Sequence, residues 1–128
     1  MKANELQIGD HVNYRGQIIK VTSLYDKGGS NEVGWSDNES VWVNADNVEP
    51  IPLTPEILEK NGFKYKEGET GMYGVTTAPH YICDGIPFEV FCDGEPFAIW
   101  FKEPINIKYV HQLQNALRLC GIEKEIEL

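Results

Sequence analysis

The sequence lacks any long apolar run: no stretch of about 18 apolar residues, the length that a membrane-spanning helix needs, occurs in its 128 residues. Residues 1–6 also lack the apolar core of a secretion signal. The apolar content of 41% is nevertheless sufficient for a hydrophobic core. We therefore expect a folded, soluble, cytoplasmic protein that does not bind a membrane.

Basic residues are scarce. Lysine and arginine number 11 against 20 aspartates and glutamates, which gives a formal charge of −9. The acidic excess is spread along the chain, since residues 1–53 hold 4 basic and 8 acidic side chains and residues 54–128 hold 7 and 12. Such a charge repels phosphate backbones, and no local basic patch offsets it. We expect no direct binding to nucleic acid.

Cysteine is sparse as well, because Cys83, Cys92 and Cys120 are too few for a complete disulfide framework and are expected to be reduced. Two of them begin copies of one motif, Cys-Asp-Gly-x-Pro-Phe, which starts at residues 83 and 92. An Asp-Gly pair between apolar runs favours a hairpin turn, since glycine adopts positive φ without strain. The repeat predicts a three-strand antiparallel meander.

The first 53 residues predict a small, strongly curved β unit. Strands are expected at residues 8–14, where Val12 and Tyr14 alternate with polar positions, and at 17–24, 33–35 and 41–43. Segment 26–31 is rich in turn-forming residues and is expected to be irregular, and Asp37-Asn38 predicts a turn. Residues 44–47 predict a single helical turn before an extended segment, 48–53, whose prolines restrict it to a sheet edge or to the ends of a strand.

Five short strands with one helical turn before the last resemble an SH3-like barrel. The spacing of Gly9-Asp10, the following aromatic residue and Gly16 also resembles KOW-type modules within that group. We therefore expect an SH3-like β-barrel subdomain over residues 1–53.

Residues 54–128 predict an α+β subdomain. Thr54-Pro55-Glu56 is a helix start and Asn61-Gly62 a helix end, so the first helix is about two turns long. Strands are then expected at residues 73–77, 81–83, 88–92 and 97–101. Apolar residues recur at helical spacing at Ile107, Val110, Leu113, Leu117 and Cys120. We expect this last helix to begin at Asn106, to end at Gly121 and to pack on the meander, which gives an α+β fold overall.

Three segments together resemble a group of uncharacterised small proteins found in Bacteroidetes and in their phages and prophages. The segments are residues 1–9 (MKANELQIG), 48–63 (VEPIPLTPEILEKNGF) and 109–115 (YVHQLQN). The resemblance implies a mobile-element or gut-bacterial context. It brings no activity, cofactor or catalytic residue.

Two imidazoles and two thiols suggest metal or thiol chemistry: His80, Cys83, Cys92 and His111. Zinc accepts such ligands, and a cysteine with a histidine base can act as a nucleophile. Only His80 and Cys83 have a typical ligand spacing, however, and free cysteine is often simply buried. The sequence also holds no phosphate-binding glycine loop and no nucleophile elbow. We expect no cofactor, no bound metal and no catalysis, and keep a metal- or thiol-dependent enzyme as an alternative.

Two sets of side chains are candidates for binding a partner. His111, Gln114 and Asn115 lie on one side of the predicted last helix, because residues three and four apart are neighbours. Aromatic residues of the predicted barrel form the second set, Tyr14, Trp35 and Trp42, as in domains that grip extended peptides. Solvation of the helix face and burial of the aromatic rings in the barrel core are the structural alternatives.

We therefore expect a noncatalytic module that binds another protein, or an adaptor. An acidic mimic of nucleic acid that blocks a DNA-binding protein remains a second alternative beside the enzyme. Unpaired strand edges near residues 50–53 and in the meander also predict pairing between copies, and hence a homodimer.

Overall fold

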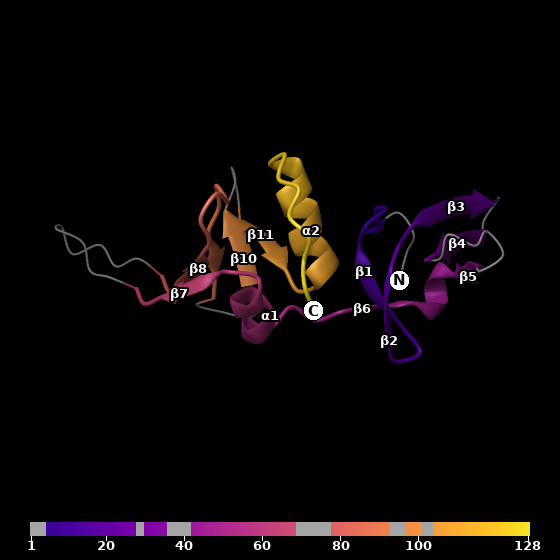
Figure 1. Ribbon diagram of the computed structural model, residues 1–128, viewed down its shortest axis with the longest axis horizontal. Coiled ribbons are helices and arrows are strands. Elements are labelled where there is room, and N and C mark those ends of the chain that lie inside the picture. The colour runs from indigo at the N-terminus through magenta and orange to yellow at the C-terminus, as the bar shows by residue number, and fades with distance from the viewer. Residues whose placement is uncertain (1–4, 28–29, 36–41, 69–77, 93–96, 101–103) are drawn as a thin grey trace. The chain divides into compact units, whose positions relative to one another are not determined.

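The computed structural model describes residues 5–27, 30–35, 42–68, 78–92, 97–100 and 104–128, and it contains strands and helices in an α+β fold (Figure 1). The chain divides into two compact units. The first unit comprises Met1–Pro52 and Tyr109–Asn115, and the second comprises Leu53–Lys108 and Ala116–Leu128. None of the helices in these described ranges is long and apolar enough to cross a membrane.

The first unit is built from two antiparallel sheets of three strands each. One has the order β2-β1-β6, with β1 at His11–Tyr14, β2 at Gln17–Lys20 and β6 at Glu49–Pro50. The other has the order β3-β4-β5, with β3 at Ser23–Lys27, β4 at Ser30–Gly34 and β5 at Trp42–Asn44. Over the described residues these sheets are separate and do not close into one barrel.

The predicted strand 17–24 is interrupted at Val21 and Thr22, where the chain passes from one sheet to the other. The Val21 N–H donates to the Asp10 carbonyl at 2.8 Å, whereas the Thr22 N–H donates to the Gly34 carbonyl, also at 2.8 Å. Adjacent residues thus pair with different strands. This change of partner explains why one predicted strand becomes β2 and β3.

Three other predictions for the first unit can be compared with the structure. The expectation that segment 26–31 is irregular is wrong, because Lys27 pairs with Ser30 and Asp26 with Asn31 in the β3–β4 hairpin. The single helical turn is confirmed as the 3₁₀ helix η2 at Ala45–Asn47, where the Asn44 side chain accepts a bond from the Asp46 N–H. The expected edge position of segment 48–53 is confirmed, because its strand β6 lies at one edge of the sheet β2-β1-β6. The Asp37-Asn38 turn lies outside the described residues.

The core of the first unit is aliphatic. Seven buried residues form one cluster: Leu6, Val12, Ile19, Val21, Val33, Ala45 and Val48. The rings of Tyr14 and Trp35 pack against this cluster and are partly buried. Burial of these side chains supplies the main stabilisation of a unit this small.

The second unit contains an antiparallel sheet in sequential order, β11-β10-β9-β8-β7, which confirms the meander and extends it to five strands. The strands are β7 at Lys64–Lys66, β8 at His80–Ile82, β9 at Val90–Phe91, β10 at Phe97–Trp100 and β11 at Pro104–Ile107. The first Asp-Gly turn is confirmed, because Gly85 has φ of 80° and the Ile86 N–H donates to the Cys83 carbonyl. The strand expected at residues 73–77 lies wholly outside the described residues. The second motif copy, which starts at residue 92, lies outside them at residues 93–96.

Helix α1, Pro55–Lys60, begins and ends as predicted. The Thr54 hydroxyl accepts a bond from the Ile57 N–H, and Gly62 follows the helix with φ of 88°. Asn61 also joins α1 to the C-terminal segment. Its Nδ2 donates to the carbonyls of Ile57 and Glu127 at 2.7 and 2.8 Å, and its Oδ1 accepts from the Glu127 N–H at 2.7 Å. This buried amide therefore holds two segments of the second unit together.

The last helix, α2, spans Val110–Leu119, so the predicted start at Asn106 is wrong. Asn106 lies in β11, opposite Ala98, and the fully buried Ile107 is also a strand residue. The predicted end is confirmed: Gly121 has φ of 72°, and the Ile122 N–H donates to the Leu117 carbonyl. The residues of helix α2 up to Asn115 belong to the first unit, and those from Ala116 onwards belong to the second.

Candidate functional site

The start of α2 is tied to the N-terminal segment by the side chain of Gln114. Its Nε2 donates to the Gly9 carbonyl at 3.1 Å and lies 3.0 Å from Nδ1 of His11. Its Oε1 accepts from the His11 N–H at 3.0 Å. Gln114 is only 5% exposed, so these bonds form in a largely dry environment. The amide fixes the helix start beside β1.

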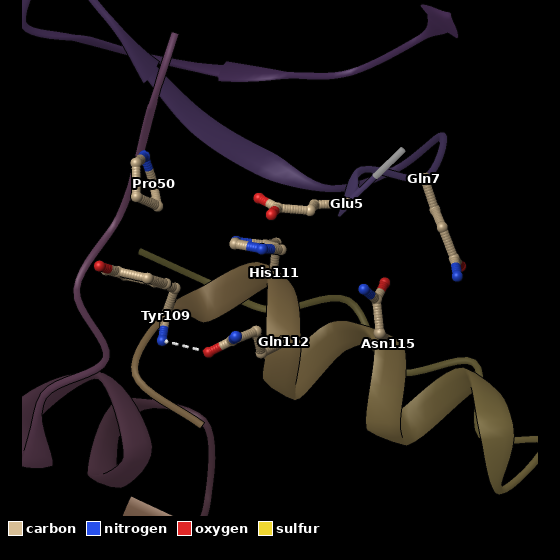
Figure 2. A pocket seen from close by; sticks show the side chains of 7 residues that line it. All are labelled: Glu5, Gln7, Pro50, Tyr109, His111, Gln112 and Asn115. Carbon is tan, nitrogen blue, oxygen red and sulfur yellow. Dashed lines mark hydrogen bonds between the residues drawn. The ribbon is translucent and has the colours of Figure 1, made fainter. Parts of the chain in front are cut away.

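The same part of the first unit contains a pocket of about 540 Å³ (Figure 2). This volume is within the range of small-ligand sites. Its lining residues come from three segments: Glu5 and Gln7 before β1, Pro50 in β6, and Tyr109, His111, Gln112 and Asn115 at the start of α2. Polar side chains and one aromatic pair therefore share a single hollow.

His111 is the most unusual residue of the pocket. The residue is 3% exposed, and its Nδ1 is buried without a hydrogen-bond partner among the described residues. A buried polar atom without a partner costs about 1–3 kcal/mol. Burial lowers the pKa of the imidazole below its usual value, against the opposing effect of the Asp10 and Glu5 carboxylates. We therefore assign a neutral His111 at pH 7.

The Glu5 carboxylate and the His111 ring both line the pocket (Figure 2), and the charge of Glu5 acts on the imidazole. Glu5 is exposed, whereas Asp10 is fully buried, with its Oδ2 accepting from the Gln7 N–H at 2.8 Å. The Asp10 carboxylate is therefore inaccessible and holds the local backbone, whereas the Glu5 carboxylate is accessible to a ligand.

Tyr109 and Gln112 shape the other side of the pocket. The Tyr109 ring is stacked on that of His111, with centroids 5.9 Å apart and planes inclined by 9°. The Tyr109 N–H donates to Oε1 of Gln112 at 3.1 Å, which caps the helix start. The Val110 N–H donates to the Ile51 carbonyl at 2.8 Å. These contacts fix the aromatic pair against the extended segment after β6.

The predicted binding residues have different positions in the structure. His111 and Asn115 line the pocket, whereas Gln114 is buried and forms the clamp, that is, its bonds to the Gly9 carbonyl and to His11. Tyr14 and Trp35 form a ring contact with centroids 5.1 Å apart, against the core. Trp42 is half-buried and meets the exposed ring of Tyr25 edge-on at 5.9 Å.

The candidate metal ligands of the second unit make other contacts. The His80 Nδ1 lies 2.9 Å from the Ala78 carbonyl, and its Nε2 is 4.0 Å from Glu89. The Cys83 thiol contacts the carbonyls of Asn61 and Asp84 at 4.0 and 3.8 Å. Cys92 is half-buried and in no disulfide. Within the part of the chain that the structure describes, no three histidine, cysteine, aspartate or glutamate side chains gather in a way that could hold a metal.

Five of the pocket's residues were not predicted from the sequence: Glu5, Gln7, Pro50, Tyr109 and Gln112. Glu5 and His111 are far apart in the chain, and only the long-range contacts of α2 bring them together. Gln112 had a local indication, because a glutamine three residues after a helix cap can complete a capping interaction. The wrong helix start at Asn106 concealed that pattern.

No family model, curated protein or solved structure matches this chain.

Proposed function

We propose that the chain is a noncatalytic protein-binding or adaptor module whose partner inserts a polar segment into the pocket of the first unit. The observation that carries the proposal is His111, which lines an open pocket while its buried Nδ1 has no hydrogen-bond partner among the described residues. A partner whose binding turned the imidazole so that Nδ1 gained a hydrogen bond would recover the cost of that buried atom.

The composition of the pocket favours binding over catalysis. No cysteine or serine lies among the described residues that line the pocket, so within that part of the chain His111 has no nucleophile to activate there. Amides, an aromatic pair and one exposed carboxylate are typical of recognition surfaces, where they fix the orientation of a ligand. The metal- or thiol-dependent alternative finds less support, because the contacts of His80 and Cys83 are with backbone carbonyls and Glu89.

An SH3-like arrangement of the first unit is part of this proposal. The strand orders β2-β1-β6 and β3-β4-β5 support it, as does the 3₁₀ turn at Ala45–Asn47 immediately before β6. Small β units of this kind commonly present binding residues on a rigid scaffold. The phage or prophage context and the homodimer remain predictions from the sequence.

Affinity capture with two matched variants tests the proposal. Asn115→Phe adds a ring to the pocket wall, whereas Gln17→Phe adds the same ring at an exposed position of β2. Tagged proteins would be incubated with a nuclease-treated lysate of the encoding organism, and bound proteins identified by mass spectrometry. Circular dichroism would first establish that both variants are folded.

We expect the wild type and Gln17→Phe to retain the same protein in high salt, and Asn115→Phe to lose it. Equal capture by both variants would remove the pocket from the binding site. Recovery of a DNA-binding enzyme that is released by salt would instead favour the acidic mimic.

A further inference from the structure

We infer that the pocket recognises the guanidinium group of an arginine side chain in the partner protein. The proposal rests on the proposed function, since it names the chemistry of the segment that the pocket receives. It is carried by two features of the described lining residues: the exposed carboxylate of Glu5 and the stacked aromatic pair of Tyr109 and His111.

Charge selects a cation over an anion. The segments of the first unit contain 8 acidic and 4 basic side chains, and among the described residues that line the pocket Glu5 is the only charged one. The buried Asp10 adds a second carboxylate close enough to act on His111. An anionic ligand would meet two negative charges here, whereas a cation would be attracted by both.

The start of α2 offers little to an anion. An anion at a helix N-terminus normally binds the free N–H groups of the first turn. Here the Val110 N–H donates to the Ile51 carbonyl, and the N–H groups of Gln112 and Leu113 donate to the Tyr109 carbonyl. Few N–H groups at the start of α2 are therefore left to bind an anion beside the positive end of the helix dipole. The nearby carboxylates determine which ligand charge is favoured, and they favour a positive one.

Shape selects arginine over lysine. The Tyr109 ring is partly exposed and lies nearly parallel to the buried ring of His111, and a planar guanidinium can stack on the Tyr109 ring. Guanidinium also presents five N–H donors and no acceptor, which suits a pocket whose lining includes the carboxylate of Glu5. A lysine ammonium has three donors and no planar face. The cavity of about 540 Å³ has room for the side chain that carries the group.

The test uses the full chain and three short peptides that differ at one central residue, arginine, lysine or citrulline. Citrulline keeps the shape of arginine without its charge. Binding is followed by nuclear magnetic resonance through the ¹⁵N signals of the imidazoles, with that of His111 assigned from a His111→Gln spectrum. Glu5→Gln removes the charge beside the imidazole, and Glu49→Gln makes the same change at an exposed residue outside the pocket lining.

We expect the arginine peptide to shift the His111 signals and to bind more tightly than the other two. Glu5→Gln should weaken its binding about three- to fivefold, the upper part of the range for an exposed ion pair, and Glu49→Gln should leave it unchanged. Equal binding of the citrulline or lysine peptide would overturn the inference, and so would the absence of any response at His111. The capture experiment judges the proposed function separately, because Asn115→Phe blocks the pocket whatever the charge of the ligand.

Discussion

Replacement of Gln114 by methionine should destabilise the first unit strongly, although methionine is close to glutamine in size and is a good helix former. The change removes the bonds of the side chain to the Gly9 carbonyl and the His11 N–H. It also removes the 3.0 Å contact with Nδ1 of His11. Two backbone groups and one ring nitrogen would lose their partner at once.

A buried group that loses its hydrogen bond costs about 1–3 kcal/mol. Gly9 and His11 are half-buried, so water can solvate them in part after the change, and the lower half of that range applies to each. For the two backbone groups together we expect a loss of about 2–4 kcal/mol in the free energy of unfolding. With a urea dependence of about 2 kcal/mol per molar, the unfolding midpoint should fall by roughly 1–2 M.

Urea unfolding followed by tryptophan fluorescence measures this effect, because Trp35 and Trp42 both belong to the first unit. The matched control is Gln17→Met, the same replacement at an exposed position of β2, which should change stability by less than about 0.5 kcal/mol. A loss below about 0.5 kcal/mol in Gln114→Met would refute the argument that this amide fixes the helix start.

Two further predictions concern Asn61 and His111. Asn61→Ala should lower the free energy of unfolding by about 1–3 kcal/mol and speed hydrogen exchange of the Glu127 amide, whose N–H donates to the Asn61 Oδ1. The control Asn106→Ala, at an exposed strand position, should do neither. Slow exchange of the Glu127 amide in Asn61→Ala would contradict the role of Asn61 in holding the C-terminal segment. Because the pKa of His111 is lowered by burial in the folded state, the unfolded chain binds a proton first, and stability should fall as the pH drops below about 6.5, by at most about 1.4 kcal/mol per pH unit from this residue. His111→Gln should flatten that dependence in urea unfolding between pH 5.5 and 7.5, and an unchanged slope would show that the residue is not buried neutral.

Features set by a few neighbouring residues were predictable from the sequence. Helix α1 follows from Thr54, which caps its start, and from Gly62, which takes positive φ after its end. The Asp84-Gly85 turn and the end of α2 at Gly121 have the same local origin. In each case the backbone conformation is decided within one turn of the chain.

Features that depend on distant partners were not predictable. Ile107 fitted the apolar spacing of the last helix, yet it belongs to β11, because pairing with β10 outweighs a weak local preference. Gln114 was expected on a polar face that binds a partner, and its place is instead inside the fold, bound to residues 9–11. No local pattern indicates that Glu5 and His111 line one pocket, since the helix start that carries His111 is held there by these long-range bonds of Gln114.

The clamp at Gln114 has a consequence for the synthesis of the protein. His11 and Gln114 are 103 residues apart, and at about 5–20 residues per second the ribosome needs roughly 5–20 s to travel from one to the other. Once residue 50 has been made, the chain contains all the described β strands of the first unit but still lacks the helix start that is bound to residues 9–11. Glu5 is then present and His111 is not, so the pocket can be completed only after residues 109–115 have been made.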